Sequence, residues 1–163
     1  MKMLLCFLLT GCGMTPLPTV YVKDPLKEEY FWFLQEAADH HHPLIPNAGI
    51  VEEGNLPTEV EPYQYEKDGE ILTEYRMVST MGLCQPRYIQ DLKGTFIFKV
   101  TIRPRSHFAS DEHYKATIAH ELAHCIMGKS HNNKPCNLMN PYMGQKTINE
   151  CGFNNLIDSI FEE

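Results

Sequence analysis

The stretch from Ser110 to Gly128 constrains the fold of this chain more than any other segment. Its apolar residues recur with the 3.6-residue period of an α-helix: Tyr114, Ile118, Leu122, Cys125 and Ile126. Ser110, followed by two acidic residues, is typical of a helix N-terminus, where a hydroxyl oxygen and negative charge are both favourable. The pattern therefore predicts a helix with one face packed on a core, which the rest of the chain must supply.

The opposite face of this predicted helix carries His120 and His124, which lie one helical turn apart. Two imidazoles at this spacing can bind one zinc ion. Glu121 lies about 100° round the helix from His120, so it is placed beside the metal and not on it. A carboxylate there can accept a proton from a zinc-bound water and hand it to a leaving amine. We interpret Glu121 as a general base.

The residues that follow the helix extend this pattern. Gly128 can end the helix in a left-handed conformation, and His131 comes three positions later. Such a turn would bring His131 back toward the metal, and three histidines plus a water complete a catalytic zinc site with an open position. Met139 follows within the segment Leu138–Pro141.

Taken together, these motifs resemble the metzincin zinc metallopeptidases, and within them the matrixin-like branch. The resemblance implies three zinc ligands, one acid/base residue and a methionine turn beneath the metal: His120, His124 and His131; Glu121; and Met139. It also implies an α+β catalytic domain with a small twisted sheet, a long N-terminal helix, a zinc-site helix and a C-terminal helix. The implied activity is that of a zinc-dependent endopeptidase with one catalytic Zn²⁺ and a peptide or protein substrate.

One departure from the family pattern concerns the third ligand. The family has two residues between the second histidine and the glycine, whereas three, Cys125–Met127, separate His124 from Gly128. One extra residue turns the end of a helix by about 100° and advances it by about 1.5 Å, so the loop must absorb this if His131 is to reach the zinc. The competing ligand is Glu150, a later carboxylate of the kind that gluzincin families use.

The N-terminal residues are typical of an export signal. Lys2 precedes the apolar run Met3–Leu9, which is too short to span a bilayer. The ending Leu9-Thr10-Gly11-Cys12 resembles the lipobox of bacterial lipoproteins, which implies lipidation of Cys12. We therefore expect an exported protein that is lipid-anchored to the bacterial cell membrane or outer membrane and faces the periplasm or exterior. The predicted organisation is a signal peptide over 1–11, a tether over 12–20 and a zinc metallopeptidase domain over 21–163.

Export also changes how the cysteines are interpreted. Removal of the signal leaves four beyond Cys12, at positions 84, 125, 136 and 151, and an even number in an oxidising compartment favours disulfides. Four cysteines allow three pairings, although Cys136 and Cys151 are close in sequence and flank a predicted loop. Cys84 could instead serve as an internal inhibitory ligand of the metal, but a disulfide or a buried thiol is favoured.

The other predicted elements are assigned from periodicity and from turn residues. A helix begins at Asp24-Pro25 and continues to His40, and a final helix covers Asn154 to Phe161. Residues 43–69 are rich in Pro, Gly, Asn and Glu and are predicted to be mostly loop. The predicted strands are Ala48 to Glu52, Ile71 to Thr80, Cys84 to Ile89 and Gly94 to Ile102.

Size and charge limit the remaining possibilities. A chain of 163 residues can bury one sizeable core, so we expect one domain and a monomer. The net charge of -7 disfavours nucleic acid and anionic lipid as electrostatic partners, so the membrane is expected to be contacted only through the N-terminal lipid. The alternative function is a non-catalytic surface lipoprotein that zinc stabilises and that binds a partner.

Overall fold

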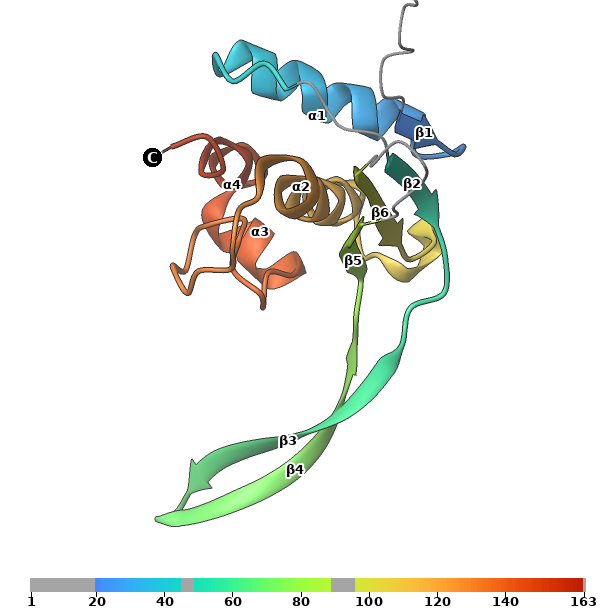
Figure 1. The fold of residues 1–163 in the computed structure, drawn as a ribbon. Coiled ribbons are helices and arrows are strands. Elements are labelled where there is room, and N and C mark those ends of the chain that lie inside the picture. The colour runs from blue at the N-terminus through green and yellow to red at the C-terminus, as the bar shows by residue number, and fades with distance from the viewer. Residues whose placement is uncertain (1–19, 45–48, 89–95, 163) are drawn as a thin grey trace, which may run out of the picture.

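The computed structural model describes residues 20–44, 49–88 and 96–162 (Figure 1). Within these ranges the fold is α+β, as predicted, with one four-stranded sheet, one two-stranded hairpin and four α-helices. The predicted signal peptide, Cys12 and all but the last residue of the predicted tether lie outside the described residues. No helix in the described part of the chain is long and apolar enough to cross a membrane.

The four-stranded sheet has the strand order β1-β2-β6-β5. Its strands are β1 (Val20–Val22), β2 (Gly49–Glu53), β6 (Phe96–Ile102) and β5 (Gly82–Tyr88). Strands β1, β2 and β6 are parallel, whereas β5 pairs antiparallel with β6 and forms one edge of the sheet. Because side chains alternate along a strand, Phe98, Val100 and Ile102 share one face of β6, and all three are buried.

Four helices pack beside this sheet: α1 (Lys27–Asp39), α2 (Asp111–Met127), α3 (Gln145–Cys151) and α4 (Phe153–Asp158). Helix α2 lies at the centre and contacts β5, β6 and each of the other helices (Figure 1). Ser110 caps it as predicted, since its hydroxyl oxygen accepts a hydrogen bond from the His113 N–H at 3.0 Å. The core-facing stripe that the sequence predicted is buried from Tyr114 to Leu122.

Two disulfides select one of the three possible pairings. Cys136 bonds Cys151, as their sequence spacing favoured, and Cys84 bonds Cys125. The second bridge joins the edge strand β5 to the last turn of α2. It also removes the free thiol that an inhibitory role for Cys84 requires.

A long hairpin differs most from the prediction. Strands β3 (Thr58–Lys67) and β4 (Glu70–Ser79) pair antiparallel along their whole length and extend away from the rest of the molecule (Figure 1). The prediction of loop over 43–69 is therefore wrong for the ten residues of β3. The two-residue turn has positive φ at Asp68 (54°) and Gly69 (83°), which is the conformation that an Asp-Gly hairpin turn adopts.

The boundaries of the other predicted elements agree with the prediction to within a few residues, whereas β1 and α3 were not predicted. Strands β2, β4, β5 and β6 lie where strands were expected, although parts of the predicted 48–52, 84–89 and 94–102 strands fall outside the described residues. Helix α1 begins at Lys27, because Leu26 and not Asp24 occupies the cap position. Helix α4 ends at Asp158 and is shorter than predicted.

Candidate metal centre

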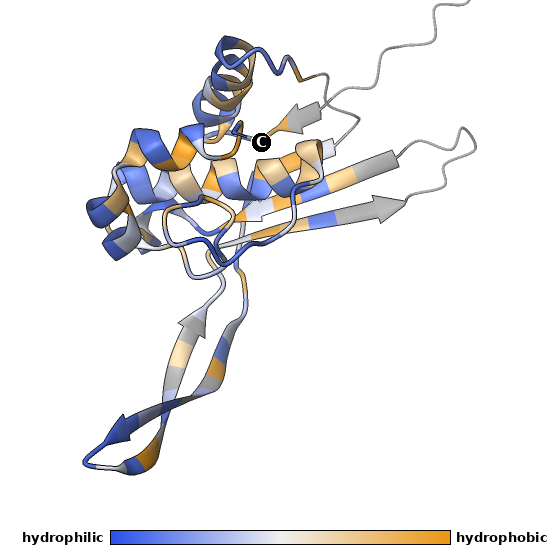
Figure 2. Ribbon diagram, turned by 90° about the vertical axis from the view of Figure 1, so that its left-hand side faces the viewer, coloured by the Kyte–Doolittle hydropathy of each residue, from blue (hydrophilic) through white to orange (hydrophobic). Residues whose placement is uncertain are grey.

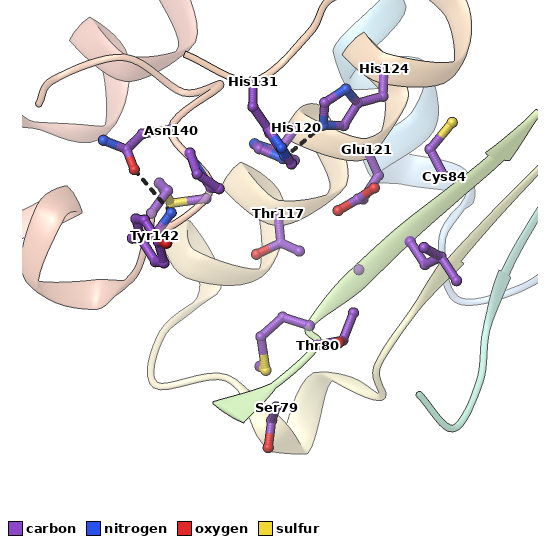
Figure 3. Close-up of a pocket in the computed structure, with 15 residues that line it drawn as sticks. Ser79, Thr80, Cys84, Thr117, His120, Glu121, His124, His131, Asn140 and Tyr142 are labelled. Atoms are coloured by element: carbon purple, nitrogen blue, oxygen red, sulfur yellow. Dashed lines mark hydrogen bonds between the residues drawn. The ribbon is translucent and has the colours of Figure 1, made fainter. Parts of the chain in front are cut away.

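A cavity of about 730 Å³ opens between α2, the edge strand β5 and the segment that follows Met139 (Figure 3). Three elements supply most of its lining: Ser79–Cys84 from the end of β4 and the start of β5, Thr117, His120, Glu121 and His124 from α2, and Asn140–Met143. His131 completes the lining, so all three predicted histidine ligands and the predicted base meet at one cavity. Its volume lies within the usual range of ligand sites, about 300–1,000 Å³.

The two helix histidines are oriented by backbone carbonyl groups. Nδ1 of His120 lies 2.6 Å from the Leu138 oxygen, and Nδ1 of His124 lies 2.6 Å from the Lys129 oxygen. A carbonyl can only accept, so each Nδ1 carries the ring proton and each Nε2 presents a lone pair. This is the tautomer that a metal ligand needs, with the other nitrogen fixed by a hydrogen bond.

The three Nε2 atoms converge on one point. Nε2 of His120 lies 3.0 Å from that of His124 and 3.2 Å from that of His131. Burial lowers the pKa of His120 to about 4, so its ring is neutral near pH 7. Facing lone pairs at such distances repel unless a cation lies between them, and nitrogens bound tetrahedrally to zinc lie about 3.3 Å apart. The donor set therefore fits a metal ion held by His120, His124 and His131.

The end of α2 shows how the chain accommodates its extra residue. In an α-helix each N–H bonds the carbonyl four residues back, but the N–H groups of Gly128 and Lys129 both bond the Ala123 oxygen, five and six residues back. The last turn is therefore wider than usual. Gly128 closes it with φ 67°, in the left-handed region, as predicted. With this wide turn, His131 reaches the same point as the two helix histidines.

The predicted methionine turn lies beneath His120. Met139 and Leu138 are buried, and the Leu138 oxygen is the one that accepts from His120. Asn137 stabilises this turn, because its Oδ1 accepts from the Met139 N–H at 2.9 Å and from the side-chain amide of Asn132 at 2.8 Å. The turn thus supports a ligand through a main-chain hydrogen bond, and Met139 contributes packing.

Glu121 lies between the histidines and β5, with its carboxylate directed along the cavity wall (Figure 3). The side chain is buried, and the N–H of Cys84 on β5 donates a hydrogen bond to it. Burial raises the pKa of the carboxyl to about 7, and the Cys84 hydrogen bond opposes that shift. A carboxyl group in this environment can exchange a proton near neutral pH, which is the property that general acid/base work requires.

Glu150, the alternative ligand, lies elsewhere. It is exposed on α3 and forms an ion pair with Lys146 at 3.7 Å. Among the described residues, the group that could hold a metal ion at this site has three members, all histidines. Of the two candidates for a third ligand, His131 is the one that the fold brings to His120 and His124.

One site residue that sequence reasoning missed is Gly82, at the start of β5. A Cβ added there would lie 2.5 Å from Cγ and 2.8 Å from Oε1 of Glu121, closer than packed atoms approach. The missing side chain at position 82 is what leaves room for the base. No local pattern indicates this, because Gly82 and Glu121 meet only once β5 packs on α2.

Comparison with known proteins adds no relatives: no protein-family model, no curated protein and no solved structure matches this chain.

Proposed function

We propose that this protein is a zinc-dependent endopeptidase with a metzincin-like catalytic domain. The observation that carries the proposal is the convergence of three Nε2 atoms beside a buried carboxylate on the wall of an open cavity. The helix that presents His120 and His124, the glycine turn before His131 and the turn at Met139 support the proposal, because they follow one another in the order that the resemblance implies. The widened helix end supports the assignment of His131 as the third ligand.

In this proposal His120, His124 and His131 hold the ion, and the Leu138 and Lys129 carbonyls keep the first two rings in the ligating tautomer. Bound zinc supplies Lewis acidity toward the scissile carbonyl and lowers the pKa of a water molecule. Glu121 accepts the proton of the attacking water on a carboxylate oxygen and returns it to the leaving amine.

The substrate backbone is proposed to pair with the outer edge of β5. This strand lies at the end of the sheet and lines the cavity through Gly82, Leu83 and Cys84. The Cys84 N–H donates a hydrogen bond to Glu121, so this part of the strand edge lies next to the proposed base. An extended peptide added there as a strand would lie across the site with its scissile bond beside the three histidines.

Export and lipid anchoring through Cys12 are part of the same proposal. The two disulfides support it, because such bonds persist in the periplasm and at cell surfaces and are rare in the cytosol. The domain that they brace would then lie outside the cytoplasm and be tethered to a membrane by its N-terminal lipid.

The alternative is a zinc ion that only stabilises the fold of a partner-binding lipoprotein. Structural zinc sites are normally closed by four protein ligands, whereas the group found among the described residues has three and faces a cavity. A buried carboxylate beside the ligands has no task in a structural site. Both observations favour the catalytic proposal.

Zinc stoichiometry tests the metal part of the proposal. Elemental analysis of the full chain should give one zinc in the wild type and a clear loss in His131→Ala. His107→Ala is the matched control, since His107 hydrogen-bonds Pro104 in the short helix Arg105–His107, and it should keep the full zinc content. Full zinc content in His131→Ala would move the third ligand elsewhere, and no zinc in folded wild type would overturn the proposal.

Substitution of the base tests the catalytic part. Glu121→Gln should retain zinc and lose about 10²–10⁴-fold in hydrolysis of a quenched fluorescent peptide library, the usual contribution of general acid/base catalysis. Glu28→Gln, at an exposed carboxylate in the first turn of α1, should match the wild type. Undiminished hydrolysis by the zinc-loaded Glu121→Gln variant would remove Glu121 from the mechanism.

A further inference from the structure

The β3–β4 hairpin, here called the arm, comprises residues 58–79. Its two strands pair with each other and with no other described strand, and they extend well beyond the helices and the four-stranded sheet (Figures 1 and 2). An isolated two-stranded ribbon is only marginally stable in water. A ribbon of this length that covers none of the other described helices and strands is therefore a candidate contact surface.

One face of the arm is almost free of charge. Residues that are paired across the ribbon share a face, and the strand register puts five such pairs together: Thr58 with Ser79, Val60 with Met77, Pro62 with Tyr75, Gln64 with Thr73 and Glu66 with Ile71. Only Glu66, next to the turn, is charged. This set is called the apolar face below.

The apolar face is strongly exposed. Val60, Ile71, Tyr75 and Met77 are 63%, 74%, 74% and 77% accessible, and they make up four of the six exposed large hydrophobic residues in the described part of the chain. Single exposed apolar residues are ordinary, but a row of them on one face marks an interaction site. Tyrosine and methionine are also side chains that interfaces favour.

The base of the arm is fixed next to the metal centre. Arg103, a buried residue that follows β6, donates to the carbonyl groups of Leu56 and Pro57 on one side and of Thr80 on the other. Thr80 and Met81 then line the cavity itself. The apolar face therefore leads, through Ser79, directly into the cavity wall, and one guanidinium group fixes the two strands at that junction.

Charge indicates what kind of partner fits. Residues 58–79 contain six acidic and two basic side chains, a net charge of -4 out of -7 for the whole chain. This charge opposes the approach of an anionic membrane and of a second, equally acidic arm. It favours a polypeptide with an apolar segment bordered by lysine or arginine, because the apolar segment can cover the apolar face while the long basic side chains reach the acidic residues at the turn and on the opposite face of a ribbon only two strands wide.

We propose that the apolar face of the arm is a docking surface for the protein substrate of the metal centre, and that it selects polypeptides with an apolar segment flanked by basic residues. The proposal rests on the proposed endopeptidase function and adds a substrate class to it. The substrate contacts the arm at a distance from the scissile bond, and the rest of its chain continues along Ser79 and Thr80 into the cavity.

Binding to labelled peptides tests the docking surface without any need for catalysis. The probes are two fluorescein-labelled libraries of about 20-residue peptides, one with an apolar centre flanked by lysines and one with glutamates in place of the lysines. Fluorescence anisotropy with the full chain carrying Glu121→Gln should show at least about tenfold tighter binding of the lysine library, a difference typical of complementary charge at an interface.

Two sets of substitutions then separate the contributions of apolar contact and charge. Ile71→Thr, Tyr75→Thr and Met77→Thr together keep β propensity, remove the apolar contact and should weaken lysine-library binding about tenfold or more. Glu59→Lys, Glu66→Lys and Glu70→Lys together should reverse the preference to the glutamate library. The matched control is Phe31→Thr, at an exposed aromatic residue on α1, which should bind as the parent does. Circular dichroism checks that every variant is folded.

Other occupants give different results. If the triple threonine variant binds the lysine library as its parent does, the docking surface is refuted. A wild-type dimer in sedimentation that the triple threonine variant abolishes would assign the face to a second copy. Wild-type pelleting with phosphatidylcholine–phosphatidylglycerol vesicles that the triple threonine variant loses would assign it to lipid. Either result overturns the proposal of a polypeptide partner.

A cleavage measurement links the arm to the metal centre. In the zinc-loaded chain, kcat/KM is measured for a 20-residue peptide of the lysine library and for a six-residue peptide with the same cleavage site. The ratio of the first value to the second should fall about tenfold in the triple threonine variant, as expected for loss of remote binding. Phe31→Thr should leave the ratio unchanged. If neither peptide is cleaved although the lysine library binds through the arm, the endopeptidase proposal fails while the docking surface stands. An unchanged ratio refutes docking of substrate.

Discussion

The body of the molecule and the arm hold their shapes by different means. In the body, helix α2 contacts two strands of the sheet and the other three helices, and Ile118 and Leu122 are completely buried. In the arm, Ile71 and Met77 are about three-quarters exposed, and the strands are held by backbone pairing and by the contact of Arg103 at the base. Burial therefore sets the positions of the candidate metal ligands, whereas the arm has a defined position without a core of its own.

Truncation of matched aliphatic residues should give the largest contrast. Leu122→Ala removes a fully buried side chain next to the candidate metal ligands and should lower the free energy of unfolding by about 2–5 kcal/mol. Ile71→Ala, on the exposed face of the arm, should stay within about 0.5 kcal/mol of the wild type. Urea unfolding followed by circular dichroism measures both. Equal losses would mean that the arm is buried against something in solution.

A glycine in the body and a glycine in the arm should differ in their effect on peptide hydrolysis. Gly82→Ala places a Cβ against the buried Glu121 and should displace its carboxylate. Peptide hydrolysis should then fall about 100-fold, which is typical when a catalytic group is misplaced by about 1 Å. Gly69→Ala at the tip of the arm meets no neighbouring atom but keeps a positive φ, so it should cost about 1 kcal/mol of stability and leave hydrolysis of a six-residue peptide unchanged. Wild-type activity in a folded Gly82→Ala protein would show that Glu121 has room to move.

Removal of the cation at the base of the arm should have an intermediate effect. Arg103→Met removes a side-chain donor from the carbonyl groups of Leu56, Pro57 and Thr80, of which Pro57 still accepts from the Thr80 N–H at 3.3 Å. This loss should cost about 1–3 kcal/mol. Limited proteolysis with chymotrypsin should cut the arm faster in this variant. Lys67→Met, at the exposed end of β3, is the control and should be cut at the wild-type rate. Identical cutting of all three proteins would remove Arg103 from the support of the arm.

Two serines should give the smallest difference. Ser110→Ala removes the cap of α2, whose hydroxyl also donates to Gln145 at 2.6 Å, and should cost about 1 kcal/mol. Ser79→Ala, at the exposed end of β4, should change the free energy of unfolding by less than about 0.5 kcal/mol. Thermal unfolding of the two variants side by side measures the difference, and a larger loss at Ser79 would reverse the comparison.

The body was the more predictable region because its signals are local. The apolar stripe lies within α2, and the capping serine and the left-handed glycine lie at its two ends. Sequence spacing was therefore enough to place His120 and His124 on one face with Glu121 beside them. The position of His131 could only be predicted conditionally. How a helix end accommodates an extra residue depends on which carbonyl oxygen accepts from the last N–H groups. Here the N–H groups of Gly128 and Lys129 both donate to the Ala123 oxygen.

The arm was missed because its strand depends on its partner. β3 carries Pro62 and several glutamates, which are unfavourable in a strand by themselves, and ten residues of pairing with β4 override that preference. The Asp68-Gly69 turn between two alternating segments was a usable signal. Gly82 and Arg103 gave none, since the contacts that make them important join residues more than 20 positions apart.

The contact of Arg103 at the base of the arm also has a mechanical consequence. β3 spans ten residues, or about 30 Å at 3.3 Å per residue, while its partner strand lies about 4.8 Å away. A relative slip of about 1 Å between the two strands at the base rotates the ribbon by about 12° and moves its tip by about 6 Å. Because Arg103 donates to carbonyl groups on both sides of the base, it opposes that slip. A single side chain at the base therefore sets the direction of a tip about 30 Å away.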